Sequence, residues 1–284
     1  MLAAQRGWWF KVGEPLLARD SLALYGRLVR GHVRSQLQYR TSFAADVLAS
    51  TVVSALDFLA ILIIFSNVPA LGGWTIAEVG VLFGLSTVAF ALTDLVVGHL
   101  DRLPDLIRSG TFDLVLVRPR GTLFQVIASD FALRRLGRAI QGLAVLGWAF
   151  ANVEVTWTWG RVAFLPIALL AAVGIFAGVW ITLICIVFWF VDGRETVNAF
   201  TDGGTFLAQY PLEIYGTWVR RFFAYVVPSA FVAYFPATYV LDRSPVDDVP
   251  SWLALGSPLV AVAVLTVGGM TWRFAVRHYR SAGG

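Results

Sequence analysis

Two acidic residues stand inside long apolar stretches, where charged side chains are rare. Asp57 falls near the middle of the run 44–66, and Asp94 falls near the end of the run 77–98. An ionised carboxylate at the centre of a bilayer costs at least about 2.5–3.5 kcal/mol on insertion scales, so such residues are functional candidates. Three interpretations are open: a polar patch on a translocation pathway or dimer seam, titrating groups of an ion- or proton-coupled transporter, or acids that hydrogen-bond to a neighbouring helix.

Motifs for enzymatic chemistry are missing from the sequence. Lys11 is the only lysine and follows Phe10, so the chain has no Gly-Lys-Ser/Thr phosphate loop and we expect no ATP hydrolysis by that route. The histidines are far apart in sequence, and the single cysteine, Cys185, lies in an apolar run. These patterns argue against a zinc site and an intramolecular disulfide. We therefore expect no catalytic residue, metal or cofactor in this chain.

Residues 100–119 mix charged and apolar side chains outside the long apolar runs. Pro104 suits the first turn of a short helix, Asp105 complements its positive N-terminal end, and Gly110 can terminate it. Leu106, Ile107 and Phe112 would then be apolar groups on a short element outside the bilayer. Exposed apolar residues flanked by charge indicate a docking surface. The alternative is an interfacial helix that contacts only lipid or its own protein.

The composition places these residues in a membrane protein. The chain has 284 residues, of which 58% are hydrophobic and 14% charged, against roughly 25% charged in a typical soluble domain. The mean hydropathy of +0.72 agrees, so an ordinary cytoplasmic domain is excluded. A net charge of +4 could suggest nucleic acid, but the arginines stand beside apolar runs. We interpret them as topology signals and expect no nucleic-acid partner.

Six apolar runs could cross a bilayer core about 30 Å thick, which requires about 20 helical residues. The sequence predicts an all-α integral membrane protein with a membrane domain over 41–275, a preceding arm over 1–40 and a cytosolic tail over 276–284. Within the arm, residues 21–38 form an amphipathic pattern typical of an interfacial helix. The predicted spans are 44–66, 77–98, 136–153, 162–191, 219–240 and 251–272.

Three details of this prediction concern helix breaks and the region between spans. The fourth run is longer than the core requires and must tilt or break, with Gly174 and Gly178 as candidate break points. The fifth is interrupted by Pro228 and Pro236, which makes 229–240 a candidate re-entrant segment. Residues 194–218 are too polar for a span, and we expect an amphipathic helix on the cytosolic side.

The basic residues predict the orientation. With six crossings, 20 of the 22 basic residues fall in alternate connections and two in the others. Because basic residues are retained on the cytoplasmic side, both termini and residues 99–135 are expected in the cytosol. Residues 67–76, 154–160 and 242–250 are expected outside.

Three separated motifs resemble those of ABC-2 type permeases, in particular a six-span bacterial subgroup. The first is the run from Ile107 to Asp113 followed by Leu116-Val117-Arg118-Pro119. The second continues from Phe124 to Arg138, and the third is the run from Pro228 to Ala237, with its Phe231 and Pro236. The motifs occur in the expected order, and the resemblance covers roughly residues 20–280.

The resemblance implies a transport subunit of an ATP-driven exporter in the bacterial inner membrane. It implies two copies of a separate cytosolic ATPase, which would carry ATP and Mg, and a second permease chain, identical or related. It also implies a cytosolic coupling helix. The residues carried over to that role are Leu106, Ile107, Arg108, Gly110, Phe112, Asp113 and Arg118. Candidates for the translocation pathway or dimer seam are Asp57, Asp94, Pro228, Phe231 and Pro236. An ion- or proton-coupled transporter and a non-transporting assembly subunit remain the alternatives.

Overall fold

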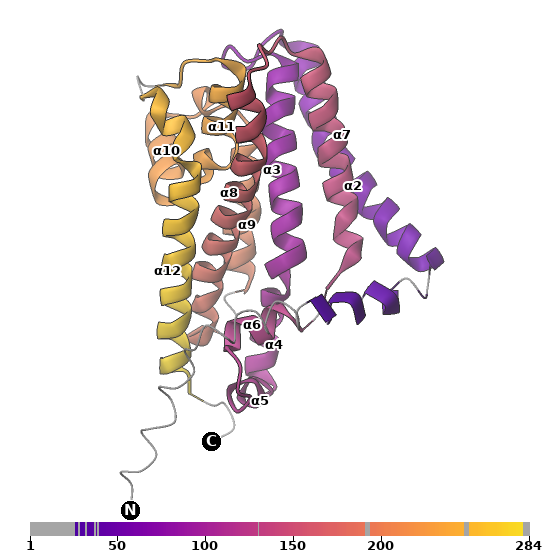
Figure 1. The fold of residues 1–284 in the computed structure, drawn as a ribbon, viewed down its shortest axis with the longest axis vertical. Helices are drawn as coiled ribbons and strands as arrows, with labels where there is room; N and C mark the ends of the chain where they lie inside the picture. The colour runs from indigo at the N-terminus through magenta and orange to yellow at the C-terminus, as the bar shows by residue number, and fades with distance from the viewer. Residues whose placement is uncertain are drawn as a thin grey trace, which may run out of the picture.

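The computed structural model of the chain describes residues 26–280, except 28, 32, 37, 39, 130, 191–193 and 247–249. Within these residues the protein is helical, and its only β-pairing is an isolated bridge between Leu71 and Trp74. Among these residues the longer helices run mostly along the long axis of the molecule, and α2 is inclined to it (Figure 1). They are α2 (Arg40–Asn67), α3 (Ile76–Val97), α7 (Leu136–Asn152), α8 (Trp159–Ile184), α9 (Arg194–Ala208) and α12 (Ser257–His278).

Short helices lie toward the two ends of the bundle. In the orientation of Figure 1, the lower end holds α4 (Leu103–Arg108), α5 (Phe112–Leu116) and α6 (Thr122–Ile127). The upper half holds α10 (Thr217–Arg221) and α11 (Tyr234–Leu241), with the loops 68–75 and 153–158. Successive long helices therefore alternate in direction, which brings residues 98–135 and the end of α12 to one end of the bundle.

In the described part of the chain, four helical stretches are long and apolar enough to cross a membrane: Thr41–Asn67, Ile76–Arg108, Trp159–Phe188 and Trp252–His278. They coincide with the predicted first, second, fourth and sixth spans, so the chain is a multi-pass membrane protein. The predicted third span is also a helix, α7, but it has only 17 residues and lies against α3.

The prediction of a fifth span over 219–240 is wrong. The chain instead passes from the lower end to the upper end through α9 and the residues that follow it, since Glu213 contacts Gly72 in the upper loop. Residues 217–228 then turn back into the bundle, where Val227 comes near Gly204 of α9, and α11 returns to the upper end (Figure 1). The predicted cytosol-side helix over 194–218 is corrected by the same observation. The sequence suggested a cytosolic position because α9 is polar. The helix runs along the bundle all the same, because its Thr201 and Thr205 side chains are buried against protein.

The α8–α12 interface depends on glycine. A Cβ on Gly178 would lie 2.7 Å from the backbone carbon of Val264, and one on Gly268 would lie 2.8 Å from the Gly178 oxygen. Small residues allow helix backbones to approach closely in membranes, where apolar contact alone gives little driving force. The predicted break at Gly174 or Gly178 does not occur, because α8 continues through both and uses them for packing.

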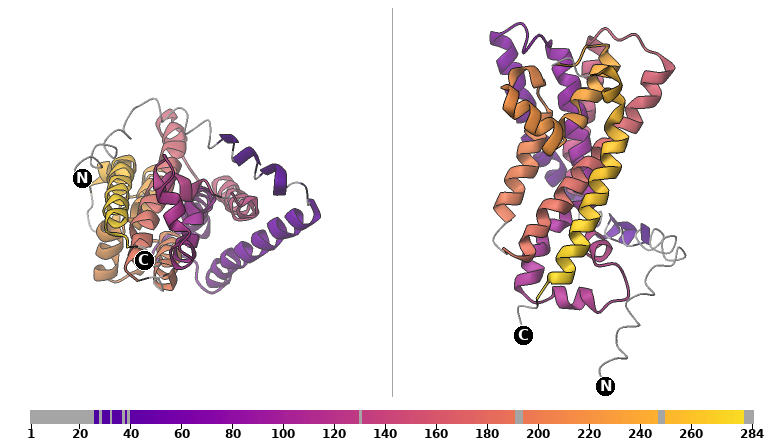
Figure 2. Two further views of the ribbon diagram at one scale, coloured as in Figure 1. Left: turned by 90° about the horizontal axis from the view of Figure 1, so that it is seen from below. Right: turned by 90° about the vertical axis from the view of Figure 1, so that its left-hand side faces the viewer.

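The α3–α7 pair meets in a similar way. A Cβ on Gly84 would lie 2.8 Å from Leu146 Cβ, and one on Gly142 would lie 2.9 Å from a methyl group of Val88. By contrast α2 is the least buried of the long helices and leans away from the bundle (Figures 1 and 2). Its lower part packs on the start of α7, where Gly137 leaves room for Val47 and Ser50.

The predicted N-terminal amphipathic helix is helical at every described position between 26 and 38. It lies across the lower end of the bundle (Figure 1). The side chain of Gln36 donates to the Phe131 carbonyl and accepts from the Leu133 backbone N–H at 2.9 Å. Arg27, Arg30 and Arg34 are exposed, while Val29 and Val33 are half-buried, so the amphipathic pattern is confirmed for these residues. Residues 1–25 of the predicted arm lie outside the described part.

Candidate functional site

Residues 100–119, which the sequence predicts as a docking surface, have the predicted local structure. Pro104 occupies the first turn of α4 and Asp105 is the acidic residue of that turn. Gly110 has φ +70°, in the left-handed region that favours glycine, and its N–H donates to the Ile107 carbonyl at 3.1 Å. The chain can therefore turn sharply between α4 and α5.

The prediction that Ile107 and Phe112 are exposed docking anchors is wrong. Ile107 is 4% exposed and Phe112 is 0% exposed. The Phe112 ring packs edge-on against Phe188, with ring centroids 5.4 Å apart, and against Tyr279 at 5.1 Å. Trp272 packs on Phe188 from α12 at 5.6 Å. These four residues, Phe112, Phe188, Trp272 and Tyr279, form an aromatic cluster that joins α5 to the lower ends of α8 and α12.

Polar contacts fix the same segment to the long helices. The indole N–H of Trp272 donates to the Thr122 hydroxyl at 3.0 Å, and that of Trp180 donates to the Asp101 carboxylate at 3.1 Å. Both α8 and α12 are thus hydrogen-bonded to residues 101–122, the stretch that contains α4 and α5. A displacement of this segment would be transmitted to both helices, because the aromatic cluster and the two indole bonds resist separation.

A different set of side chains forms the exposed surface of the segment. Leu114 is 60% exposed and Val117 is 80% exposed, and Arg108 and Arg118 are exposed as well. Leu106, Gly110 and Asp113 are half-buried. The apolar groups available to a partner are therefore Leu114 and Val117, which the sequence analysis did not select. Helical spacing could have shown that they lie away from Phe112.

Asp57 faces a small polar cleft inside the chain rather than the outer surface of α2. Residues from α2, α3, α7 and α9 line this cleft, which holds about 30 Å³ of space: Ser54, Asp57, Thr87, Arg138, Thr205, Phe206 and Gln209. The Gln209 amide donates to the Thr87 hydroxyl at 3.4 Å, and the Ser86 hydroxyl donates to the Thr205 carbonyl at 3.3 Å. The sequence indicated Asp57, but not that Arg138 would share its cleft.

Asp94 has a partner at the lower end of the bundle. Its carboxylate lies 3.1 Å from the Arg135 guanidinium, which also donates to the Asp94 carbonyl. Gly98 makes this possible, since a Cβ there would collide with the guanidinium. The pair links α3 to the start of α7, and the structure does not bring Asp94 together with the Asp57 cleft.

Pro228, Phe231 and Pro236 are buried in the segment that turns back into the bundle. The Ser257 hydroxyl donates to the Phe231 carbonyl at 2.8 Å, which fixes the turn to the start of α12. Pro228 and Phe231 line a cavity, whereas Pro236 lies within α11. These three residues shape one segment and are not near Asp57.

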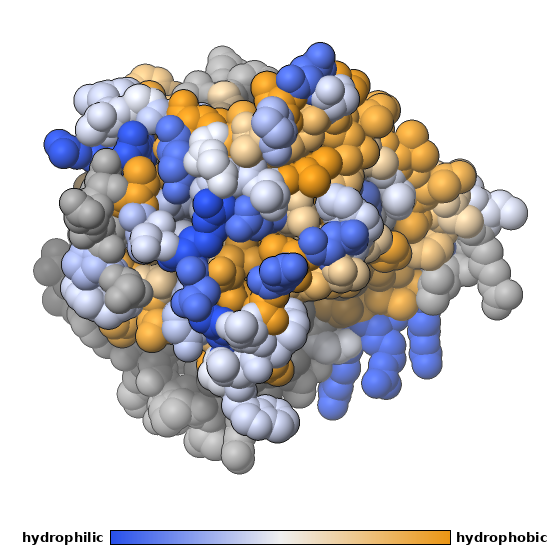
Figure 3. All heavy atoms as spheres, turned by 90° about the horizontal axis from the view of Figure 1, so that it is seen from above, coloured by the Kyte–Doolittle hydropathy of each residue, from blue (hydrophilic) through white to orange (hydrophobic). Residues whose placement is uncertain are grey.

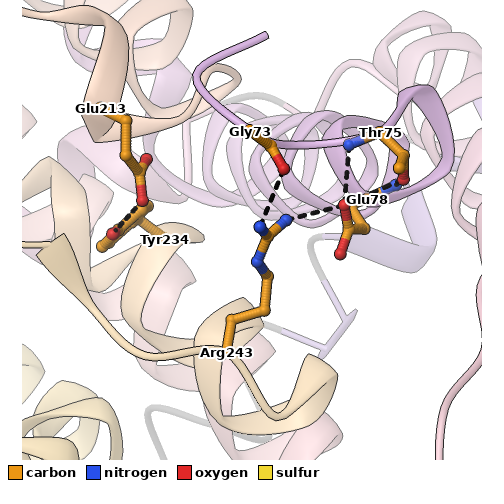
Figure 4. Close-up of polar contacts among 6 residues, drawn as sticks. All are labelled: Gly73, Thr75, Glu78, Glu213, Tyr234 and Arg243. Carbon is orange, nitrogen blue, oxygen red and sulfur yellow. Dashed lines mark hydrogen bonds and ion pairs between the residues drawn. The ribbon is translucent and has the colours of Figure 1, made fainter. Parts of the chain in front are cut away.

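A polar cluster at the upper end was missed by the sequence analysis. Arg243 follows α11 and donates to Glu78 of α3 and to the Gly73 carbonyl, both at 2.8 Å (Figure 4). Its guanidinium lies 4.7 Å from the Trp74 ring centroid. The Tyr234 hydroxyl donates to Glu213 at 2.7 Å. The Thr75–Glu78 capping box was visible in the sequence, but its link to Arg243 spans 165 residues and had no local signal.

Residues 217–243, which turn back into the bundle and return to its upper end, are called the returning segment here. The Arg243 contacts attach this segment to α3 at the upper end. Polar and charged residues gather around the middle of this end, and apolar residues cover much of its flank (Figure 3). Burial, and to a smaller extent Tyr210, raise the pKa of the neighbouring Tyr215 to about 12, so its phenol stays uncharged near neutral pH. No described group of three or more His, Cys, Asp or Glu side chains could hold a metal ion.

A family model described as "ABC-2 family transporter protein" matches residues 51–283. The chain belongs to the ABC-2 transporter family. The match includes all three motifs of the sequence analysis and every long helix from the middle of α2 onward. No curated protein and no solved structure matches the chain. This ABC-2 permease is thus a membrane-spanning transport subunit of a family whose members typically pair with an ATPase.

Proposed function

We propose that this ABC-2 permease is the membrane subunit of an exporter and that it converts ATP hydrolysis on a separate subunit into substrate movement. Two copies of a cytosolic ATPase would hold ATP and Mg, and a second permease, identical or related, would complete the transporter. The permease itself needs no cofactor and performs no catalysis. Family membership argues against an ion-coupled secondary transporter.

One observation carries this proposal: residues 100–119 at the lower end have an exposed face and a buried face with different contacts. Leu114 and Val117 are exposed beside Arg108 and Arg118. On the buried face, Phe112 is enclosed by Phe188 and Tyr279. We propose that the ATPase binds the exposed face. Its movement would then reach α8 and α12 through the aromatic cluster.

The distribution of basic residues supports six crossings with the lower end in the cytosol, and we propose the bacterial inner membrane as the location. By sequence position, 18 of the 22 basic residues precede or begin α2, lie between α3 and α7 or in the first turn of α7, begin α9, or lie in the last turns of α12 and after it. The other four are Arg161, Arg220, Arg221 and Arg243, toward the upper end. Basic residues are favoured on the cytoplasmic side, so both termini are proposed to lie there and residues 26–38 to lie at the membrane interface.

The Asp57 cleft is proposed as part of the translocation pathway. It combines a carboxylate, a guanidinium and hydroxyl groups between four helices, within a bundle that exposes many large apolar side chains. Because Asp57 faces the chain's own helices, we propose it for the pathway and not for a seam between permeases. Movement of α2, the least buried long helix, would widen this cleft.

The test of ATPase binding uses Leu114→Ser combined with Val117→Ser. Truncating interface anchors typically costs on the order of 2 kcal/mol or more, roughly thirtyfold in affinity. Co-purification with the partner ATPase is therefore expected to fall strongly, with the permease still monodisperse. Trp252→Ser removes an exposed apolar side chain at the upper end and serves as the matched control. Full ATPase recovery with the double variant would contradict this site of contact.

A further inference from the structure

Two adjoining cavities lie between the returning segment and the long helices. The larger has a volume of about 640 Å³ and lies between α8, α9, α12 and residues 222–231. The smaller, about 460 Å³, is lined by Thr217, Trp218, Arg221, Phe222 and Val226 of α10 and the turn after it. Phe222 and Val226 line both, so the two spaces adjoin at these side chains. The larger volume is within the roughly 300–1,000 Å³ range of ligand pockets.

The larger cavity offers a ligand apolar contact. Its lining includes Val179, Leu183, Phe231, Val264 and Val267. Thr182 also lines it, but its hydroxyl proton is already donated to the Gly178 carbonyl at 2.7 Å. A polar molecule would lose its hydrogen bonds to water there without replacement. The cavity therefore accepts hydrocarbon.

The smaller cavity adds a positive charge at one end of this apolar space. Arg221 is exposed, and among the described residues no carboxylate forms an ion pair with it. Trp218 stacks on Phe222 with ring centroids 5.5 Å apart and is itself exposed. Tryptophan side chains favour the depth of lipid headgroups. The polar end of the combined space thus lies at a depth suited to a headgroup, with a guanidinium to bind an anion.

We propose that the combined cavity binds an amphiphile with one hydrocarbon chain and an anionic group, and that such molecules are the substrate class of this transporter. The hydrocarbon lies in the larger cavity and the anionic group at Arg221. The assignment as substrate rests on the proposed function, whereas the binding site does not. Because bilayer lipid is as apolar as the cavity wall, the hydrocarbon alone gives little preference over the membrane. Selection depends on Arg221.

A helix from a second copy of the chain fits this space poorly. A helix with side chains is about 10–12 Å wide and rises about 5.4 Å per turn, so little more than one turn would fill the larger cavity. A single hydrocarbon chain is much thinner and can follow the cavity lengthwise. The Arg221 guanidinium at the rim, which pairs with no carboxylate among the described residues, also attracts an anion, which a membrane-embedded apolar helix lacks.

The binding test uses the purified chain in phosphatidylcholine nanodiscs. The probes are two photoreactive lysolipids with the same diazirine-bearing chain. One has an anionic phosphate headgroup and the other a zwitterionic phosphocholine headgroup. The phosphate-headed probe is expected to label peptides spanning 222–231 and 260–267 about tenfold more strongly, as one charge-assisted contact would give. Equal labelling by both probes would overturn the site.

Two variants and two matched controls separate the parts of the site. Arg221→Gln is expected to remove the headgroup preference, and Ala263→Phe, at the cavity wall, to remove labelling by both probes. Arg273→Gln removes an exposed arginine at the lower end, and Val262→Phe enlarges an exposed α12 residue outside the cavity lining. Both controls should label like the unmodified chain. Unchanged preference in Arg221→Gln, or crosslinks joining two permeases through 260–267, would overturn the proposal.

The substrate assignment is tested separately on the complex with the ATPase. The phosphate-headed lysolipid is expected to stimulate ATP hydrolysis in the unmodified complex and not in the Arg221→Gln complex. Selective labelling without stimulation would overturn the assignment as substrate while the site stands. A complex that fails to assemble or hydrolyse ATP would contradict the proposed function and leave the labelling result unaffected.

Discussion

Phe112 and Val117 lie five residues apart and have opposite roles in the structure. Phe112 is enclosed by aromatic rings, whereas Val117 is 80% exposed. Replacing a buried phenylalanine by alanine typically costs about 3–5 kcal/mol, and exposed substitutions usually change stability by less than about 0.5 kcal/mol. We predict that Phe112→Ala lowers the free energy of unfolding markedly and that Val117→Ala does not. Unfolding in mixed micelles measures both, and equal values would contradict the aromatic cluster.

Arg243 should stabilise the protein more than Arg161, which also forms an ion pair at the upper end. It contacts Glu78, the Gly73 carbonyl and the Trp74 ring together. Arg161 pairs with Asp242, whose side chain is 78% exposed, and such pairs are worth about 0–1 kcal/mol. We predict a larger loss of thermal stability for Arg243→Gln than for Arg161→Gln. A double-mutant cycle of Arg243→Gln with Glu78→Gln should show coupling of about 0.5 kcal/mol or more. Additive losses would show that the contact is energetically neutral.

At the scale of elements, glycines at helix contacts should be distinguishable from glycines with free space. Gly178 has no room for a Cβ, while a Cβ on Gly269 of α12 would meet no atom within 4 Å. Alanine favours helix over glycine by about 1 kcal/mol where it fits. Gly269→Ala is therefore predicted to be neutral or stabilising, and Gly178→Ala destabilising, in the same micelle assay. Stabilisation by both would mean that α8 and α12 are not in close contact.

Sequence patterns correctly predicted the elements that depend on residues close together in the chain. The spans α2, α3, α8 and α12 follow from apolar length, and the turn at Gly110 follows from helix-end chemistry. The path of α9 could not be predicted in this way, since Thr201 and Thr205 are polar but buried by other helices. For the same reason Phe112 looked exposed: its enclosure depends on Phe188 and Tyr279, which are distant in sequence. Contacts between remote segments decided both cases.

For the whole molecule, the corrected path of α9 makes a topological prediction. In a Cys185→Ser background, a cysteine at Gly216 is expected to react with an impermeant reagent from outside the cell. One at Ser109 should react only after access to the cytosol. Both positions are exposed, and Cys185 is buried, so background labelling is low even before its replacement. Cytosolic labelling at position 216 would restore the earlier interpretation of 194–218 as a cytosol-side helix.

The glycine contacts between α3 and α7 bear on how the chain enters the membrane during synthesis. With 17 residues, α7 is shorter than the about 20 that span a bilayer, and arginines crowd its start. Insertion of such a helix by the translocon alone is unfavourable, so α3, already made, would receive it through Gly84 and Gly142. We predict that α7 on its own inserts poorly into microsomes, that α3 preceding it restores insertion, and that Gly84→Leu weakens the rescue. A glycosylation acceptor placed in 153–158 reports each case, and efficient insertion of α7 alone would refute this order of assembly.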